Sequence, residues 1–307
     1  MFVLKKLIFL FPVISGILWG SAGIFVRTLT KMNMNSYTIV ESRVILAVLI
    51  LGAGIYLYDK SLLKIKLKDV WVFLGGGILG MFGLNVCYNI AIEELTLSLS
   101  AVLLSLSPLF VLILAAIIFR EKITSRKILC MIMAIVGCIL ASGVLESSSG
   151  MKWSVYGIAV GTMGAIFYAM YSIFTKLAIQ RGYGPLTITF YCLLTVFIVL
   201  IPLTDWNVIV SSISSSPINM SVFMVVHALC TSVLPYVMYT VSLDYIEAGK
   251  ASILASGEPI AAMIFGIIFY SEIPTLISLT GLFLVICAIT LLSAQPEKKY
   301  KEINVNS

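Results

Sequence analysis

Ionisable side chains inside long apolar segments are the residues of this chain best suited to bind a polar solute or carry a proton. Glu258 precedes Pro259 in one such segment, and Glu41 and Arg43 stand near the start of another. An ionisable group at membrane depth costs at least about 2.5–3.5 kcal/mol, so we expect each to face a cavity or a partner. Glu258 is predicted to contact a cationic group of a substrate or to hold a proton. The structural alternative is a neutral acid hydrogen-bonded to backbone that the proline frees.

Arg43 allows two interpretations. Its planar guanidinium suits a substrate carboxylate, because it can donate two parallel hydrogen bonds. Alternatively, it pairs with Glu41 and with helix ends near the membrane interface. Glu258, Arg43 and Glu41 are assigned to coupling or gating. The same role is assigned to two prolines within apolar segments, Pro108 and Pro259.

Aromatic and amide side chains fall in the segments that would surround a central cavity. Asn85 and Asn89 are four positions apart and hence lie on one face of a helix. Rings would suit the apolar part of a small amphipathic solute, and amides its polar end. The alternative is helix packing or a belt at the membrane interface. Together with Glu258, the predicted substrate-binding residues are Trp19, Asn85, Tyr88, Asn89, Tyr168, Tyr171, Tyr236 and Tyr239.

The residue patterns of an enzyme are absent from the sequence. His227 is the only histidine, and there is no HExxH, GxSxG or phosphate-loop motif. The six cysteines have no CxxC or Cys/His spacing, which disfavours a disulfide framework or a metal site. We expect no catalytic residue, no cofactor, no metal and no ATP hydrolysis by this chain. His227 is expected to be a hydrogen-bonded packing residue, with pH sensing as the alternative.

The elements that must position these residues are membrane-spanning helices. Of the 307 residues, 60% are hydrophobic and 11% are charged, and the mean hydropathy of +1.09 is far above that of soluble domains. The apolar run after Lys5 and Lys6 is longer than the apolar part of a secretory signal peptide, so we interpret it as the first membrane span rather than as a cleaved signal. Windows of about 19 residues give ten spans. Their approximate cores are 8–29, 37–58, 70–92, 97–119, 126–145, 153–176, 185–203, 220–244, 249–270 and 275–293.

The basic residues are distributed unevenly between the two sides of the membrane. With the N-terminus in the cytoplasm, sixteen of the twenty Lys and Arg residues fall on the inner side and three on the outer side, while Arg43 lies within a span. This asymmetry is a strong positive-inside signal. The net charge of +6 therefore indicates orientation rather than nucleic-acid binding. We predict a multi-pass protein of a prokaryotic cytoplasmic membrane with both termini in the cytoplasm.

The chain contains an internal duplication. Residues 151 positions apart match in type, among them Pro108 with Pro259 and Glu121 with Glu272. Five spans per half is an odd number, so two halves with one fold must enter the membrane from opposite sides. We predict an all-α polytopic protein of ten transmembrane helices arranged as two inverted five-helix repeats. The first repeat covers 1–147, the second covers 148–294, and 295–307 forms a cytoplasmic tail.

The matched landmarks predict local structure as well. Pro108 and Pro259 lie near the middle of the fourth and ninth spans, where a proline removes a backbone hydrogen bond and kinks the helix. Equivalent interrupted helices point to a substrate site near the midplane, and simple bending of packing helices is the alternative. Glu121 and Glu272, at the ends of these spans, are expected to cap helices and anchor loops.

Small and basic residues supply two further expectations. Glycines four positions apart, such as Gly16 and Gly20, predict close helix packing. Arg27 and Lys176 match across the duplication and are expected to extend their charged ends toward water at opposite helix ends.

The fourth span and its copy carry a family resemblance. The runs 98–110 (SLSAVLLSLSPLF) and 251–259 (ASILASGEP) resemble the fourth helix of an EamA-type repeat in the drug/metabolite transporter superfamily, and Trp19 and Arg43 also fit that pattern. The resemblance covers nearly the whole chain. It implies a five-plus-five inverted bundle that moves small metabolites by alternating access, often as an exporter, and it favours a structural role for Arg43. Gly257 departs from the bulkier apolar residue that is usual there.

These features predict a secondary transporter. The expected cargo is a small amphipathic metabolite, an amino acid or a molecule of similar size, moved outward across the cytoplasmic membrane by alternating access. The alternatives are an uptake permease or exchanger for a small cationic or nucleobase-like metabolite, and a membrane channel or scaffold without carrier activity. The expected partners are the small-molecule substrate and the lipid bilayer, with proton coupling as an option and no nucleic acid. The chain is expected to be a monomer or a homodimer.

Overall fold

The computed structural model describes residues 2–95, 97–142, 144–145, 154–271 and 273–293, and no strand occurs among them. Nine helical stretches in this part of the chain are long and apolar enough to cross a membrane. A further helix, α8 (Ser125–Ala141), occupies the place of the fifth predicted span and has 17 residues. At about 1.5 Å per residue it is roughly 25 Å long, a little shorter than a hydrocarbon core of about 30 Å. The all-α polytopic fold is therefore confirmed, and the described residues contain nine candidate spans of full length and one shorter helix in the place of the fifth predicted span.

The first half of the chain contains five crossings, three of which consist of more than one helix. The first is α1 (Phe2–Gly20) with α2 (Ala22–Thr30), and the second is α3 (Ser36–Tyr58). The third is α4 (Val70–Leu74), the π-helical segment η3 (Gly75–Phe82) and α5 (Gly83–Glu94). The fourth is α6 (Leu97–Leu104) with α7 (Ser107–Phe119), and the fifth is α8. The 3₁₀ segments η1 (Lys60–Leu63) and η2 (Leu67–Asp69) join the second crossing to the third.

The second half repeats this order with one added helix. Its first two crossings are α9 (Val155–Gln180) and α10 (Pro185–Leu200), the latter followed by the 3₁₀ segment η4 (Ile201–Leu203). Its third crossing is α12 (Pro217–Ala228), the π-helical segment η5 (Leu229–Val233) and α13 (Leu234–Tyr245). The fourth is α14 (Ala248–Ala255) with α15 (Glu258–Tyr270), and the last is α16 (Leu276–Ser293).

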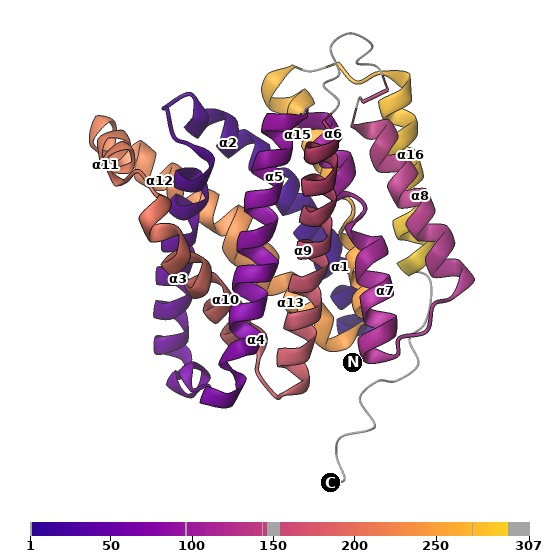
Figure 1. Ribbon diagram of the computed structural model, residues 1–307, viewed down its shortest axis with the longest axis horizontal. Helices are drawn as coiled ribbons and strands as arrows, with labels where there is room; N and C mark the ends of the chain where they lie inside the picture. Colours follow the sequence, from indigo (N-terminus) through magenta and orange to yellow (C-terminus); the bar gives the residue numbers. More distant parts are fainter. Residues whose placement is uncertain (1, 96, 143, 146–153, 272, 294–307) are drawn as a thin grey trace.

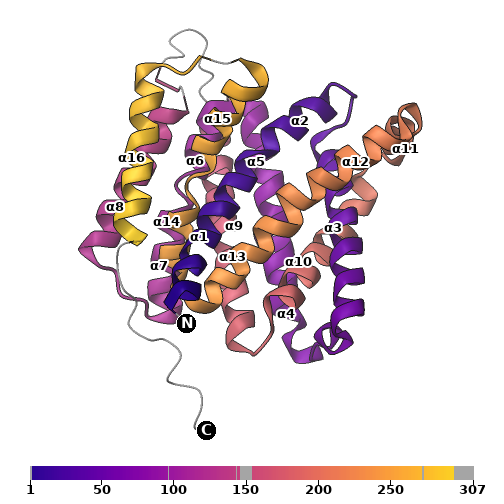
Figure 2. The ribbon, with the colours of Figure 1, turned by 180° about the vertical axis from the view of Figure 1, so that it is seen from behind.

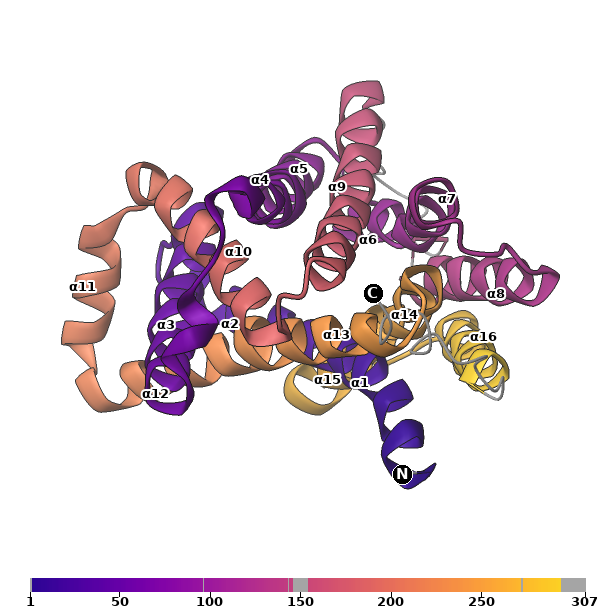
Figure 3. The ribbon, with the colours of Figure 1, turned by 90° about the horizontal axis from the view of Figure 1, so that it is seen from below.

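The added helix is α11 (Trp206–Ser215), which the hydropathy pattern does not predict as a separate element. Figure 3 shows it at one flank of the bundle, with α8 and α16 at the opposite flank. The Asp205 side chain accepts hydrogen bonds from the amides of Asn207 at 3.1 Å and Val208 at 3.3 Å. Aspartate at this position satisfies amide groups that a helix start leaves without partners, so Asp205 defines where α11 begins.

The duplication is visible in matched irregularities of the backbone. Arg120 and Ser271, which are 151 positions apart, end α7 and α15 in the left-handed region with a φ of 55° each. Their amides donate to the carbonyls of Ala115 and Gly266, which are matched by the same offset. A positive φ is uncommon for residues other than glycine. A positive φ recurs at matched positions, and each third crossing contains a π-helical segment. The two halves therefore have the same backbone conformation at these points.

The two halves run in opposite directions. The Lys250 Nζ, at the start of α14, lies 4.3 Å from the centre of the Phe9 ring near the start of α1. The Lys176 Nζ, near the end of α9, donates to the carbonyl of Ile246 just before α14 at 2.8 Å. The start of α1 and the end of its counterpart α9 therefore lie at the same end of the bundle. The start of α8 likewise contacts the end of α16, and these helices lie side by side (Figures 1 and 2).

The fourth crossing of each half is interrupted, as predicted, but neither proline lies in mid-helix. Two turn residues separate α6 from α7, and two separate α14 from α15. Pro108 and Pro259 consequently stand in the first turn of the second helical piece. At this position the missing amide N–H has no intrahelical acceptor in any case. The expected kink within a continuous helix is therefore replaced by a break followed by a new helix start.

Gly16 and Gly20 bring α1 against the interruption in the second half. A Cβ atom on Gly16 would lie 2.4 Å from the carbonyl oxygen of Ala255, and one on Gly20 would lie 2.5 Å from that of Glu258. Only glycine leaves room for so close an approach between backbones. The predicted packing role of these glycines is confirmed, and the contact fixes the start of α15 beside α1.

Two predictions about charged helix ends are refined by long-range contacts. Glu121 is a capping residue, but it caps α14 of the other half, accepting from the amides of Ala248 at 2.8 Å and Gly249 at 3.2 Å. Lys176 does not extend into water, because its Nζ donates to the carbonyls of Leu243 and Ile246 at the end of α13. Glu272, the predicted repeat boundary at 147/148 and the tail 295–307 lie outside the described residues.

Candidate functional site

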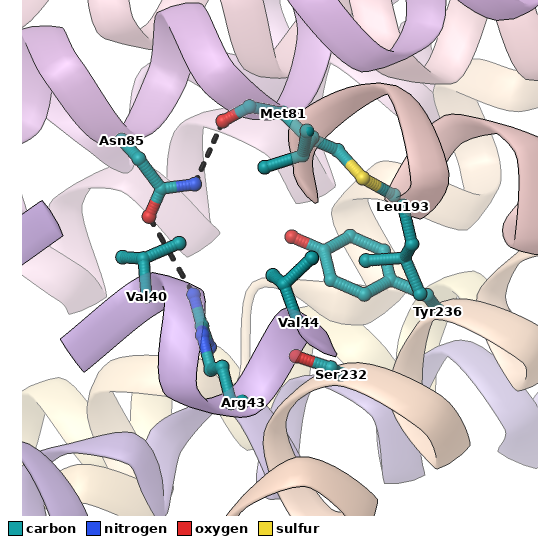
Figure 4. Close-up of a pocket in the computed structure, with 9 residues that line it drawn as sticks. Val40, Arg43, Val44, Met81, Asn85, Leu193, Ser232 and Tyr236 are labelled. Carbon is teal, nitrogen blue, oxygen red and sulfur yellow. Dashed lines mark hydrogen bonds between the residues drawn. The ribbon is translucent and has the colours of Figure 1, made fainter. Parts of the chain in front are cut away.

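A narrow pocket lies where helices of the two halves meet (Figure 4). It draws on α3, η3 and α5 from the first half and on α10, η5 and α13 from the second. Figure 4 shows the side chains of Arg43 and Asn85 directed toward one another at its edge. The lining residues are Val40, Arg43, Val44, Met81, Asn85, Leu193, Val196, Ser232 and Tyr236.

Arg43 is held by groups from both halves. Its Nη1 donates to the carbonyl of Thr231 in η5 at 3.3 Å, and its Nη2 lies 3.5 Å from Oδ1 of Asn85. The Asn85 Nδ2 in turn donates to the carbonyl of Met81 at 2.7 Å, which orients the amide. A guanidinium has five N–H groups, so these contacts leave donors that can bind a solute.

Glu258 is the acidic group at the centre of the bundle. It is the first residue of α15, where the helix dipole favours a negative charge. Its carboxyl group interacts electrostatically with Arg43, Tyr88, Tyr168 and Tyr236. These four residues come from α3, α5, α9 and α13. The structure therefore brings the cationic Arg43 of the first half within electrostatic range of the acidic Glu258 of the second half. The sequence alone does not indicate this proximity.

Aromatic rings pack around Trp19 in this environment. The centroid of Trp19 lies 5.2 Å from that of Tyr236, 5.6 Å from that of Tyr239 and 6.1 Å from that of Tyr168. Tyr171 joins the group through Tyr236, at 5.3 Å. The five predicted aromatic residues of α1, α9 and α13 thus form one cluster. The indole Nε1 of Trp19 is buried and has no hydrogen-bond acceptor among the described residues.

Two members of this cluster already have partners for their hydroxyl groups. The Tyr239 hydroxyl is 2.9 Å from Ser172 Oγ, and the Tyr171 hydroxyl is 3.1 Å from Thr240 Oγ1. Both tyrosines are buried, and both contacts join α9 to α13. These hydroxyls therefore join α9 to α13 rather than point to a solute.

The amide residues of α5 lie near the same centre. Asn85 lines the pocket, and Asn89 follows one turn later with its Nδ2 buried and without an acceptor in the described part of the chain. Ser232, another pocket residue, has a buried hydroxyl with no partner there. Buried polar groups are normally hydrogen-bonded, so such groups beside a pocket are candidates for solute contacts.

Glu41 is not part of this cluster. Its side chain is fully buried, and neither carboxyl oxygen has a hydrogen-bond partner among the described residues. The expected pair with Arg43 is not formed, because residues two positions apart on a helix point in different directions. Burial without a partner favours the neutral acid over the carboxylate.

His227, at the end of α12, is buried and stacks on Phe25 with ring centroids 4.8 Å apart. The expected hydrogen bond is missing, since neither ring nitrogen has a partner in the part of the chain that the structure describes. The ring also lies within electrostatic range of Arg43. Among the same residues, no group of three or more His, Cys, Asp or Glu side chains could hold a metal ion.

The pocket is too small for a metabolite in this conformation. Its volume is about 10 Å³, about the space of one water molecule, whereas ligand sites typically enclose about 300–1,000 Å³. A metabolite of amino-acid size could therefore fit into this pocket only after the helices around it move.

Two segments of the chain, residues 6–143 and 155–294, match the model of the EamA-like transporter family. An uncharacterized transporter of Archaeoglobus fulgidus is 29% identical over 228 residues, covering 74% of this chain and 78% of the relative. The pseudopaline exporter CntI of Pseudomonas aeruginosa is 27% identical over 231 residues, covering 74% and 76%. A solved crystal structure has a TM-score of 0.73 at 13% identity, covering 92% of this chain and 95% of its own, and shows the shared fold. The chain therefore belongs to the EamA-like transporter family and is a multi-pass membrane transporter rather than an enzyme.

Proposed function

We propose that this protein is a secondary carrier that exports a small zwitterionic metabolite of amino-acid size by alternating access. The observation that carries the proposal is the placement of the Arg43 guanidinium, which Thr231 and Asn85 hold at 3.3 and 3.5 Å within electrostatic range of Glu258 of the second half. The guanidinium is suited to a carboxylate, and the carboxylate of Glu258 is suited to an ammonium group. A zwitterion would bridge the two.

The surroundings of this pair fit the rest of an amphipathic solute. Trp19 and Tyr236, with ring centroids 5.2 Å apart, offer an apolar wall beside the two charged groups. The Nε1 of Trp19 and the Nδ2 of Asn89, which have no acceptor among the described residues, are donors for an additional polar group. A single guanidinium balanced by one carboxyl group suits a cargo without net charge better than a phosphorylated one.

The transport movement is proposed to use the interrupted fourth crossings. The breaks at 105–106 and 256–257 lie at equivalent places in the two inverted halves, which is the arrangement found at midplane sites of carriers. Rocking at these breaks would widen the central pocket toward either end of the bundle. A permanently open channel would need a continuous passage, whereas the central pocket holds about 10 Å³.

The direction of transport is proposed from a relative. One relative, the pseudopaline exporter CntI, is an exporter by name. Proton coupling through Glu258 is part of the proposal, because a proton and the ammonium group of a substrate would compete for the same carboxylate.

The test is counterflow in proteoliposomes that contain the purified full chain. Vesicles loaded with one unlabelled amino acid at a time are diluted into the labelled form, over a panel of zwitterionic, cationic and anionic solutes. A carrier gives exchange that saturates with concentration and selects zwitterions. Flux that rises linearly for all solutes identifies a channel, and no flux for any solute contradicts the carrier.

A further inference from the structure

A second, larger hollow lies away from the centre, at the end of the bundle where α3 ends and α10 begins. Its volume is about 210 Å³. It is formed by the loop of η1 and η2 on one side and the turn from α9 to α10 on the other. The side chains of its wall that matter here are Ser61, Lys64, Lys66, Arg181, Tyr183 and Thr187.

Hydrogen bonds between the two sides fix the shape of this hollow. The Thr187 hydroxyl donates to the carbonyl of Leu62 at 2.8 Å, and the Tyr191 hydroxyl donates to that of Leu63 at 2.6 Å. The Tyr183 hydroxyl accepts the amide N–H of Lys66 at 3.0 Å. Three hydrogen bonds thus attach the connecting loop to α10 and to the turn before it. The walls of the hollow are therefore held in place by the fold.

The charge of the wall is positive. Lys64, Lys66 and Arg181 line it, and the facing acids are outside it. Asp69 accepts from Arg181 Nε at 3.1 Å, which engages one of the five N–H groups of the guanidinium. Asp59 interacts with Lys64, and hydrogen bonds from Ser61 hold the pKa of Asp59 below its ordinary value.

The phenol of the wall adds no negative charge. Burial raises the pKa of Tyr183 above its ordinary value, so the hydroxyl stays protonated. It therefore remains a donor to Asp69 Oδ2, at 2.8 Å. Three cations against two acids, neither of which lines the hollow, leave a net positive wall. This chemistry suits a phosphate group.

Exposed apolar side chains stand next to the lining residues in the sequence or contact one of them, and they indicate where that phosphate comes from. Leu57 at the end of α3 and Leu67 in η2 are 83% and 91% exposed. Trp71 in α4 is 47% exposed, and the Arg181 guanidinium lies 4.8 Å from its ring. A free phosphate would gain nothing from these surfaces, whereas acyl chains would cover them.

We infer that this hollow binds the phosphate headgroup of an anionic phospholipid, with the acyl chains along the exposed apolar side chains beside it. Lys64 and Lys66 are the principal contacts, because neither forms an ion pair at contact distance among the described residues, whereas Arg181 already pairs with Asp69. Basic pockets at the cytoplasmic ends of transmembrane helices commonly hold such headgroups. The inference does not depend on the transported solute.

The experiment measures lipid binding to the purified full chain in a non-ionic detergent. Phosphatidylglycerol, phosphatidylcholine and inorganic phosphate are titrated separately, and bound lipid is counted by native mass spectrometry while the melting temperature is recorded. The test variant is Lys64→Gln with Lys66→Gln. The matched control is Lys60→Gln with Lys68→Gln, which removes the same charge from the same loop at exposed residues outside the hollow.

We expect one phosphatidylglycerol to bind and to raise the melting temperature more than phosphatidylcholine or inorganic phosphate does. The test variant should weaken this binding about 30-fold, at roughly tenfold or less per lysine, and the control less than about threefold. The single variants Lys64→Gln and Lys66→Gln should each show part of the loss. Equal losses in test and control overturn the inference in favour of diffuse attraction. Equal effects of phosphatidylcholine, or of inorganic phosphate, overturn it as well.

Discussion

The carboxylate of Glu121 accepts a hydrogen bond from the backbone amide of Ala248 at 2.8 Å, which joins the end of α7 to the start of α14. Its second oxygen accepts from the amide of Gly249 at 3.2 Å. Beside this contact, the Lys127 ammonium forms an ion pair with Glu247. Two hydrogen bonds and one ion pair therefore attach the first half of the chain to the start of α14 in the second half.

Replacing Glu121 should destabilise the protein in a graded way. Glu121→Gln keeps one acceptor but removes the charge at the helix start, whereas Glu121→Ala removes both hydrogen bonds. Loss of such a cap costs about 1–2 kcal/mol, so Glu121→Ala should lower the melting temperature by a few degrees and Glu121→Gln by less. The measurement is thermal unfolding of the purified protein in detergent.

The control is Thr124→Ala, which removes a single, longer cap within one half. Thr124 Oγ1 accepts from the amide of Lys127 at 3.3 Å at the start of α8. Its loss should be smaller than that of Glu121→Ala. A Thr124→Ala effect as large as that of Glu121→Ala would speak against the contact between the halves as the stronger one.

Gly20 should not tolerate alanine, whereas Gly23 should. A Cβ atom on Gly20 would lie 2.5 Å from the Glu258 carbonyl oxygen and 2.6 Å from the Ala261 Cβ, but one on Gly23 would meet no atom within 4 Å. Gly20→Ala should cost about 1–3 kcal/mol of stability through overpacking and displace Glu258, which would reduce transport. Gly23→Ala should be neutral or stabilising by up to about 1 kcal/mol. The melting temperatures and exchange rates of both variants provide the test. Equal melting temperatures and equal exchange rates for the two variants would contradict the close approach of α1 to α15 at Gly20.

The hydroxyl of Tyr239 should stabilise the folded protein rather than bind substrate. Tyr239→Phe leaves the buried Ser172 hydroxyl without this partner, 2.9 Å away in the native protein, at a cost of about 1–2 kcal/mol. In the double variant with Ser172→Ala the losses should not add, with a coupling of about 0.5–1.5 kcal/mol. Unfolding measurements on the four proteins of this cycle provide the test. Additive losses, or a change in KM with no change in stability, would instead assign the hydroxyl to the substrate.

Exchange should weaken at low pH through Glu258. A proton on its carboxylate removes the charge that holds the ammonium group of the substrate, so KM should rise as pH falls. Glu258→Gln should show a high KM with little dependence on pH. Glu41→Gln is the control, because Glu41 lies outside the cluster and its side chain already favours the neutral form. Counterflow at several pH values measures this, and an unchanged pH profile in Glu258→Gln would exclude Glu258 as the proton site.

The duplication and the breaks could be predicted from the sequence because they are recorded locally. The match between Pro108 and Pro259 places the interruptions to within a few residues, since proline restricts the backbone wherever it stands. The left-handed ends at Arg120 and Ser271 show how closely the halves agree. The prediction that each proline lies within a continuous helix is wrong. Composition alone does not show that the helix ends before the proline and that a new one begins there.

Contacts between distant segments could not be predicted from the sequence. Glu121 was expected to cap a helix, but nothing in its neighbourhood identifies α14 as that helix. One of the two interpretations of Arg43 pairs it with Glu41, which is close in sequence, whereas in the structure its guanidinium contacts Asn85 and Thr231. The electrostatic link between Arg43 and Glu258 depends on how α3 and α15 meet. That arrangement follows from the packing of two inverted halves rather than from any local pattern.

The most direct test of the proposed carrier compares three solutes across two variants. One solute is a zwitterion that the wild-type protein exchanges, and the others are the same molecule without its carboxylate and without its amine. Arg43→Gln should slow exchange of the zwitterion and of the acid about 10- to 100-fold and spare the amine. Glu258→Gln should slow the zwitterion and the amine to a similar degree and spare the acid. If both variants slow all three solutes by the same factor, or slow none, the two residues do not bind opposite ends of the cargo.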